Sequence, residues 1–120
     1  MSRLLVHLST GPENPTRAAL ALLVARSARS AGHDVDVFLA GDAVQLLRDA
    51  TLGATHGIGT GSLREHYDAL AADGARFFAS GASSKARALD ADGLGGKAVE
   101  FATPDRLVAL AFEADRVISY

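Results

Sequence analysis

Cysteine is absent from this sequence of 120 residues. Its absence excludes disulfides, thiolate ligands for a metal, and any reaction in which a thiol acts as nucleophile or carries sulfur. The four histidines, at positions 7, 33, 56 and 66, show neither H-x-x-H nor H-E-x-x-H spacing. We therefore expect no metal site.

The sequence also lacks an excess of charge of one sign and a long hydrophobic run. Twelve basic residues face 14 acidic ones, for a formal net charge of −2, which argues against nucleic acid or an anionic membrane as partner. The longest apolar stretch, Ala18 to Ala25, is far shorter than the roughly 20 residues that span a bilayer, and His7 interrupts the apolar start of the chain. We expect a cytoplasmic protein.

The glycine fingerprints of nucleotide-binding proteins are missing as well. The turn after the first expected strand has only Gly11, and the prolines at positions 12 and 15 remove backbone donors from it. Gly57, Gly59 and Gly61 have the wrong spacing for G-x-G-x-x-G, and no G-K-S or G-K-T follows a strand. We expect no bound cofactor.

The segments that are present alternate between strand and helix patterns over the whole chain. This alternation predicts one domain, residues 1–120, built as a three-layer α/β/α sandwich around a mostly parallel five-stranded sheet. The expected strands are Leu4–Leu8, Asp34–Ala40, Ala75–Ala79, Ala98–Phe101 and Arg116–Ser119.

Each expected helix begins with a side chain suited to cap it. These caps are Asn14 before Pro15, Asp42 three residues before Gln45, Ser62 three residues before Glu65, and Thr103 before Pro104.

The first helix, Pro15 to about Ala31, is apolar almost all round between Ala18 and Ala25. A helix that covers one face of a sheet needs an apolar stripe of only about 100°. The additional apolar surface of this helix indicates a subunit interface, and hence a homo-oligomer. Alternatively, the alanines only supply helix propensity at an exposed surface.

The candidate site lies where the carboxyl ends of the parallel strands meet, because open α/β sheets bind ligands there. The loops after the strands, Ser9–Asn14, Gly41–Asp42, Ser80–Lys85 and Ala102–Pro104, converge on that edge. The candidate ligand-binding residues are His7, Thr10, Gly11, Asp42, His56, Ser80, Gly81, Ser83, Ser84, Lys85 and Arg87.

The serines after the third strand allow two interpretations. A serine hydrolase would use Ser80 or Ser83 with His7 or His56 as base, but residues 81–85 lack the closing glycine of G-x-S-x-G. In the simpler interpretation, Ser83 or Ser84 caps a short helix that contains Arg87. No residue is expected to be catalytic unless the hydrolase interpretation holds.

Two long segments resemble the DsrE/DsrF/YchN-like family, which is associated with sulfur relay. They are LLVHLSTGPENPTRAALALLVARSARSAGHDVDVFLAGDAVQLL, from Leu4, and ALAADGARFFASGASSKARAL, which ends at Leu89. The resemblance implies a flavodoxin-like sheet of strand order 2-1-3-4-5, assembly as trimers or hexamers, and homologous proteins as possible partner subunits.

The sequence departs from the family pattern in the serine turn. Ser80 and Ser83 stand where the family pattern C-G-x-C-x-x-x-R-G has cysteine, and Ala88 stands where glycine often follows Arg87. A hydroxyl cannot form a persulfide, so the relay chemistry that the resemblance implies cannot use this turn.

These observations favour a homo-oligomer that binds a small anionic ligand or a protein partner at the turn, without covalent catalysis. Hydroxyl and backbone groups of the turn would donate hydrogen bonds, and Lys85 and Arg87 would form a positive rim. Two alternatives are a non-catalytic subunit of a sulfur-relay type complex and the small hydrolase described above.

Overall fold

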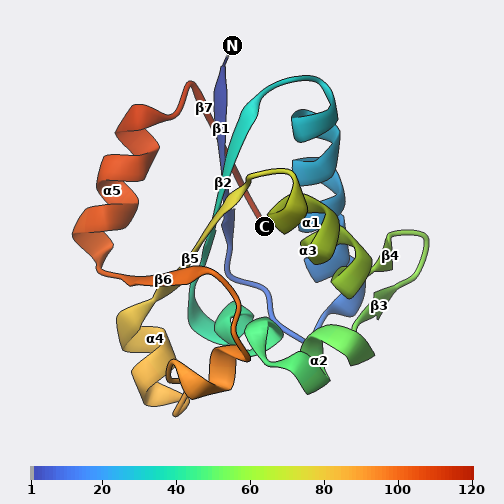
Figure 1. Cartoon of the computed structure of the whole chain (residues 1–120), viewed down its shortest axis with the longest axis vertical. Helices are drawn as coiled ribbons and strands as arrows, with labels where there is room; N and C mark the ends of the chain where they lie inside the picture. The colour runs from blue at the N-terminus through green and yellow to red at the C-terminus, as the bar shows by residue number, and fades with distance from the viewer. Residues whose placement is uncertain (1) are drawn as a thin grey trace.

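The computed structural model describes residues 2–120 and contains a five-stranded sheet in which every pair of neighbouring strands is parallel (Figure 1). The order across the sheet is β6-β5-β2-β1-β7. The strands are β1 (Arg3–Leu8), β2 (Asp34–Leu39), β5 (Arg76–Ser80), β6 (Val99–Ala102) and β7 (Arg116–Ser119). The parallel five-stranded α/β sheet predicted from the sequence is confirmed.

The order of the strands differs from the flavodoxin-like order. Numbered along the chain, the five strands of the sheet lie in the order 4-3-2-1-5, and the expected 2-1-3-4-5 is wrong. Three successive crossovers place β2, β5 and β6 in turn on one side of β1, and the fourth crossover places β7 on the opposite side of β1. Since crossovers between parallel strands are right-handed, this last crossover lies on the other face of the sheet from the earlier ones.

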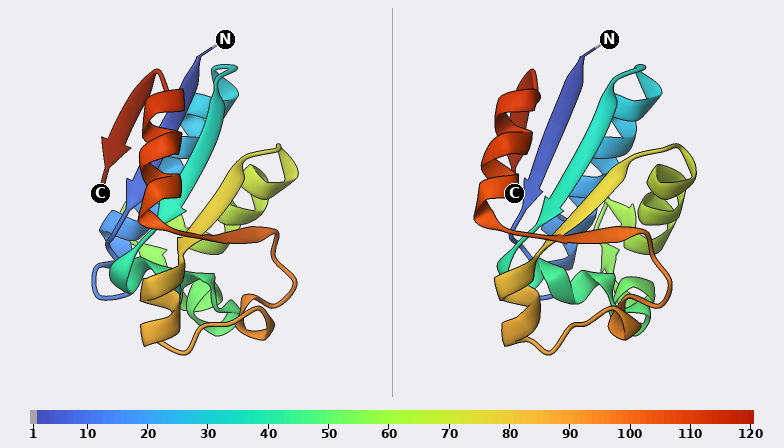
Figure 2. Two further views of the ribbon diagram at one scale, coloured as in Figure 1. Left: turned by 90° about the vertical axis from the view of Figure 1, so that its left-hand side faces the viewer. Right: turned by 60° about the vertical axis from the view of Figure 1, so that its left-hand side comes forward.

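Helices cover both faces, as the three-layer prediction requires. Figure 2 shows α1 and α3 on one face of the sheet and α5 on the other. The shorter elements η1, α2, α4 and η2 lie towards the carboxyl ends of the strands. The helices are α1 (Pro15–Ser30), η1 (Gly41–Leu47), α2 (Asp49–Ala54), α3 (Leu63–Ala72), α4 (Gly81–Ala86), η2 (Asp92–Leu94) and α5 (Pro104–Glu113).

Three of the four expected helix caps are confirmed. The side chains of Asn14, Ser62 and Thr103 accept the backbone N–H groups of Arg17, Glu65 and Arg106, respectively. The prediction for Asp42 is wrong, because residues 41–47 form the 3-10 helix η1, which follows Ala40 and has no side-chain cap.

The face under α1 and α3 holds most of the core, including Val6, Leu8, Val37 and Leu70. The apolar surplus of α1 is buried partly inside the subunit, because α1 packs against α3 and against a hairpin formed by β3 (His56–Gly57) and β4 (Gly61–Ser62). Leu23 remains 36% exposed. Internal packing therefore accounts for much of the surplus that suggested an interface.

The hairpin is fixed to the start of α1. The Ile58 N–H donates to Thr16 Oγ1 (3.0 Å), and the Thr60 hydroxyl donates to the Thr16 carbonyl (3.0 Å). His66 is buried beneath it, 3.1 Å from the Arg26 guanidinium through Nδ1 and 2.7 Å from the Thr60 carbonyl through Nε2. The hairpin therefore explains why this polar side chain is only 6% exposed.

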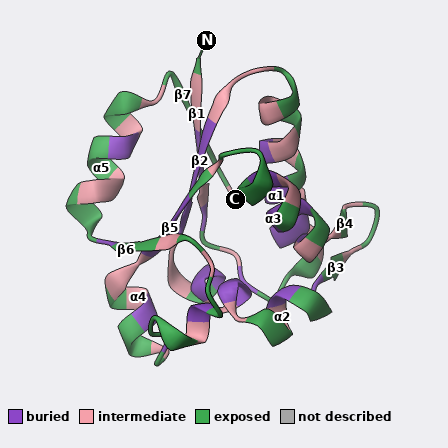
Figure 3. Cartoon of the chain, in the orientation of Figure 1, coloured by how far each residue is buried: buried purple, intermediate pink, exposed green. Residues whose placement is uncertain are grey.

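The opposite face is covered by α5 alone and has a core of five buried residues, Leu5, Phe38, Phe78, Ala102 and Leu110. Figure 3 shows α5 exposed along most of its outer side. Phe112 is 88% exposed and Val108 54% exposed.

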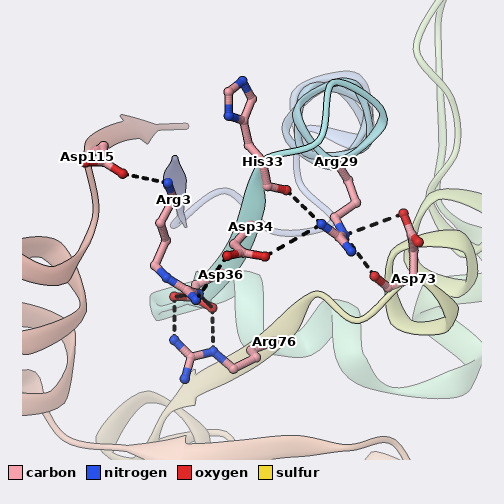
Figure 4. Close-up of polar contacts among 8 residues, drawn as sticks. All are labelled: Arg3, Arg29, His33, Asp34, Asp36, Asp73, Arg76 and Asp115. Atoms are coloured by element: carbon pink, nitrogen blue, oxygen red, sulfur yellow. Dashed lines mark hydrogen bonds and ion pairs between the residues drawn. The ribbon is translucent and has the colours of Figure 1, made fainter. Parts of the chain in front are cut away.

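A buried carboxylate also lies on this face, near the amino ends of the strands (Figure 4). Asp36 is fully buried and accepts two hydrogen bonds from the Arg76 guanidinium, at 2.7 and 2.8 Å, and two from Arg3, both at 3.2 Å. The hydrogen bonds from Arg76 to Asp36 raise the pKa of Arg76 above its ordinary value.

None of the helices within residues 2–120 is long and apolar enough to cross a membrane.

Candidate ligand site at the carboxyl edge

The loops that follow β1, β2 and β5 meet at the carboxyl edge of the sheet. Gly11, after β1, touches the backbone of the next loop, because a Cβ atom at this position would lie 2.4 Å from the Asp42 carbonyl oxygen. The Gly41 N–H donates to Ser83 Oγ (2.8 Å), which ties the loop after β2 to α4. Gly11, Asp42 and Ser83 are therefore brought together as the sequence suggested, and Thr10 lies half-buried beside Gly11.

The serine turn is held by hydrogen bonds to the backbone. The Ser80 Oγ caps α4 by accepting the N–H of Ser83 (3.2 Å). Our expectation that Ser83 or Ser84 is the cap is wrong, because α4 begins at Gly81, directly after the strand. The oxygens of Ser80 and Ser83 thus each accept a backbone N–H within the fold.

Arg87 is not free to bind an anion. Its guanidinium lies 3.0 Å from the Asp42 carboxylate and donates to the Ser83 carbonyl (3.1 Å). The Arg87 carbonyl in turn accepts a hydrogen bond from Arg48 (2.7 Å). Asp42 and Arg87, both candidate ligand-binding residues, therefore neutralise each other and join η1 to α4.

A shallow pocket of about 550 Å³ lies on the other side of α4, between this helix and β6. Among residues 2–120, Lys85 has neither an ion pair nor a hydrogen bond through its side chain, which is exposed to solvent. The carboxylate of Asp90 accepts the N–H of Gly93 (3.0 Å). The lining is mostly apolar and consists of Gly81, Ser84, Lys85, Ala88, Leu89, Asp90, Ala91 and Phe101.

Ser84 lies at the floor of this pocket. It is only 1% exposed, and its hydroxyl oxygen is buried without a hydrogen-bond partner among the described residues. A buried hydroxyl without a partner costs roughly 1 to 3 kcal/mol. The floor of the pocket therefore holds a polar group whose hydrogen-bonding capacity is unused.

The pocket is shaped by an unusual turn at Ala88. This residue has a φ of +54°, in the left-handed region, which costs a residue with a Cβ about 1 to 2 kcal/mol. The turn lets the Leu89 N–H donate to the Ser84 carbonyl (2.8 Å) and places the Leu89 side chain in the pocket. A glycine would adopt this φ without strain, which explains the glycine that often follows the arginine in the family pattern.

The two histidines proposed for the site do not contact the serines. His7 lies at the end of β1 on the α5 face, where its ring forms a T-shaped pair with that of Phe38 (6.1 Å between centroids) and its Nε2 has no partner among the described residues. Burial lowers the pKa of His7 below its ordinary value. His56 is exposed on the hairpin, away from α4 in Figure 1. Within residues 2–120, no hydrogen bond joins a histidine to Ser80 or Ser83.

Sequence reasoning missed the apolar half of the pocket, which Ala88, Leu89 and Phe101 provide. No sequence signal marked it: Phe101 fits the pattern of an ordinary strand residue, and its 37% exposure at the edge of the sheet is visible only in the structure. No group of three or more metal-ligating side chains occurs in the part of the chain that the structure describes.

Comparisons with known proteins support the fold over the whole chain. The profile of the DsrE/DsrF-like family matches residues 2–120. The YchN protein from E. coli is similar in structure, with a TM-score of 0.80, 21% sequence identity and full coverage of both chains. The protein of unknown function MTH1491 from Methanobacterium thermoautotrophicum has a TM-score of 0.79 and 17% identity, also with full coverage of both. No curated protein matches the sequence.

Proposed function

Because the chain belongs to the DsrE/DsrF-like family, we propose that it is a cysteine-free member that binds a small anionic ligand without covalent chemistry. In this proposal it acts in the cytoplasm as a homo-oligomer. The observation that carries it is the pocket between α4 and β6, with the unpaired Lys85 at its wall.

Lys85 is the group in the pocket that would bind an anion, and the lining also holds the carboxylate of Asp90. The sequence has two lysines, and the other one, Lys97, is paired with Asp49 and donates to the Leu94 carbonyl. Lys85 has no such partner, so a ligand carboxylate or similar group would supply the missing counter-charge. The apolar walls at Leu89 and Phe101 suit a ligand that also has a hydrophobic part.

The residues at the turn support a role without covalent chemistry. No thiol is available anywhere in the sequence. The Ser80 and Ser83 oxygens are engaged with backbone N–H groups, at 3.2 and 2.8 Å. The hydrolase alternative needs a base within about 3 Å of a serine hydroxyl, and no observed contact supports it.

Native mass spectrometry followed by calorimetric titration with benzoate tests this proposal. We expect either a copurified small molecule or benzoate to bind the native chain, and Lys85→Gln to weaken that binding by about 10-fold, as loss of a charged hydrogen bond does. Lys97→Gln is the control, since it removes the other lysine but leaves the pocket intact. Equal affinities of the native chain and Lys85→Gln, or no bound molecule in either measurement, would show the proposal to be wrong.

The assembly is proposed as a trimer or hexamer, as the family resemblance implies. The exposed Val108 and Phe112 on α5 support association. They would equally suit a homologous subunit in a sulfur-relay type complex, which remains the second candidate.

A further inference from the structure

Strand β7 lies at the open edge of the sheet. It pairs with β1 on one side, and no strand within residues 2–120 pairs with it on the other. All four of its residues, Arg116 to Ser119, are exposed, including Val117 (48%) and Ile118 (36%). An edge strand with apolar side chains and free backbone groups is a template for pairing with another strand.

The hydrogen bonds between β1 and β7 show which backbone groups are free. The Tyr120 N–H donates to the His7 carbonyl (2.9 Å), and the Ser9 N–H donates to the Tyr120 carbonyl (2.9 Å). Backbone groups alternate in direction along a strand, so those of Ile118 also point towards β1. The N–H and C=O groups of Val117 and Ser119 therefore point to the open edge.

Helix α5 lies beside this edge, alongside β7 in Figure 2. Val108 and Phe112 stand two residues before and two residues after the buried Leu110, so at 100° per residue they project from the outer side of the helix, away from the sheet. Val117 shares the α5 face of the sheet with Leu5 and is 48% exposed at the open edge.

The other edge of the sheet is protected. Strand β6 carries Glu100, which is paired with Arg106, and a charge of this kind discourages strand pairing. Strand β7 has neither proline nor lysine, and its one charge, Arg116, lies at its first residue. Only β7 is suited to extend the sheet.

We propose that β7 pairs in antiparallel orientation with β7 of a second copy of this chain, across a two-fold axis. The backbone groups that point to the open edge fix the register. Val117 of each copy faces Ser119 of the other, and these two pairs together form four backbone hydrogen bonds. Ile118 faces Ile118 of the second copy. The two α5 helices then lie on the same face of a ten-stranded sheet. This inference rests on the homo-oligomer of the proposed function and names its surface.

A second copy is the occupant because the surface is complementary to itself. The two-fold axis brings Ile118 against Ile118 of the other copy and pairs the free backbone groups of Val117 with those of Ser119 in both directions, as in an isologous interface. It also places the two Arg116 side chains at opposite ends of the paired strands, whereas a parallel pair would put them side by side. A two-fold contact is compatible with a hexamer and not with a lone trimer.

The absence of native cysteine makes a clean test possible. Ile118→Cys would place two thiols on directly opposed residues of a non-hydrogen-bonded pair, whose Cα atoms lie about 4.5 Å apart, within the range of a disulfide. Oxidation with diamide at micromolar protein concentration should convert most of this variant to a covalent dimer. Phe101→Cys, a similarly exposed apolar position on β6, is the control and should give at least about 10-fold less dimer. Equal yields from the two variants would overturn the proposal.

A second measurement covers the case in which a cysteine perturbs the strand. Val117→Lys should raise the dissociation constant of the assembly by about 100-fold or more, measured by analytical ultracentrifugation, because each copy contributes one buried charge. Ile58→Lys, at the 88% exposed tip of the hairpin, is the matched control and should leave it unchanged. Circular dichroism melts confirm that both variants are folded. If the native chain is monomeric, both the proposed homo-oligomer and the proposed β7 surface are wrong. If the native chain is an oligomer and Val117→Lys does not weaken it, only the proposed surface is wrong.

Discussion

The two faces of the sheet are built differently. Under α1 and α3, buried apolar residues form one continuous cluster, with Val6, Leu8 and Leu39 at 0 to 2% exposure. Under α5, the buried cluster has five residues and is interrupted by the polar side chains of Asp36 and His7. The first face supplies stability, whereas the second has room for polar groups and for surfaces that a partner can cover.

Leucine truncation on each face provides the largest expected difference. Leu8→Ala should lower the free energy of unfolding by about 4 kcal/mol, because the sealed core around it cannot collapse into the cavity. Leu110→Ala should cost only about 2 kcal/mol, because a single helix can shift towards the sheet. Both leucines are fully buried, so they form a matched pair. Urea unfolding measures both values, and a larger loss at Leu110 would contradict the comparison.

Removal of the buried carboxylate tests the polar part of the α5 face. Asp36→Ala leaves Arg3 and Arg76 without their shared partner and should cost about 3 kcal/mol, the lower end for a buried ion pair, since both arginines retain solvent contact. Asp34→Ala is the control: its side chain is 47% exposed and pairs with Arg3 at 3.5 Å, so we expect a loss below about 1 kcal/mol. Similar urea midpoints for both variants would show that burial of Asp36 contributes little.

The smallest expected effect is a pH dependence that originates at His7. Because burial lowers the pKa of His7 in the folded state, the unfolded chain binds a proton first as the pH falls. The stabilisation is complete above the unfolded pKa of about 6.5 and is lost as the pH drops from there through the lowered folded pKa. The free energy of unfolding should therefore fall more between pH 7.5 and 5.5 for the native chain than for His7→Leu. Parallel curves for the two proteins would disprove this assignment.

Much of the fold was predictable because the sequence patterns of the strands agree with the residues that the fold buries. The strand Arg116–Ser119 was predicted with its observed bounds, and the other expected strands lie within a residue of the observed ones. The order of strands was not predictable in this way, since β1 and β2 are both buried on two faces and their sequences do not say which neighbour lies on which side.

At the candidate site, only the convergence of the loops could be predicted from the sequence. The convergence of Gly11, Asp42 and Ser83 follows from the parallel sheet, whose carboxyl ends share one edge. The pairing of Asp42 with Arg87 does not follow, because the two residues are 45 positions apart in the sequence and their contact depends on the path of α4. The pocket was missed for a similar reason, since the left-handed turn at Ala88 joins Leu89 to Phe101 on a separate strand.

The hydrogen bond from Gly41 to Ser83 limits what can replace this serine. Sulfur is a weak acceptor, and a cysteine at position 83 would loosen the joint between the loop after β2 and α4. A thiol introduced at this position would therefore weaken the fold that has to hold it, because the Ser83 hydroxyl is a structural part of the carboxyl edge.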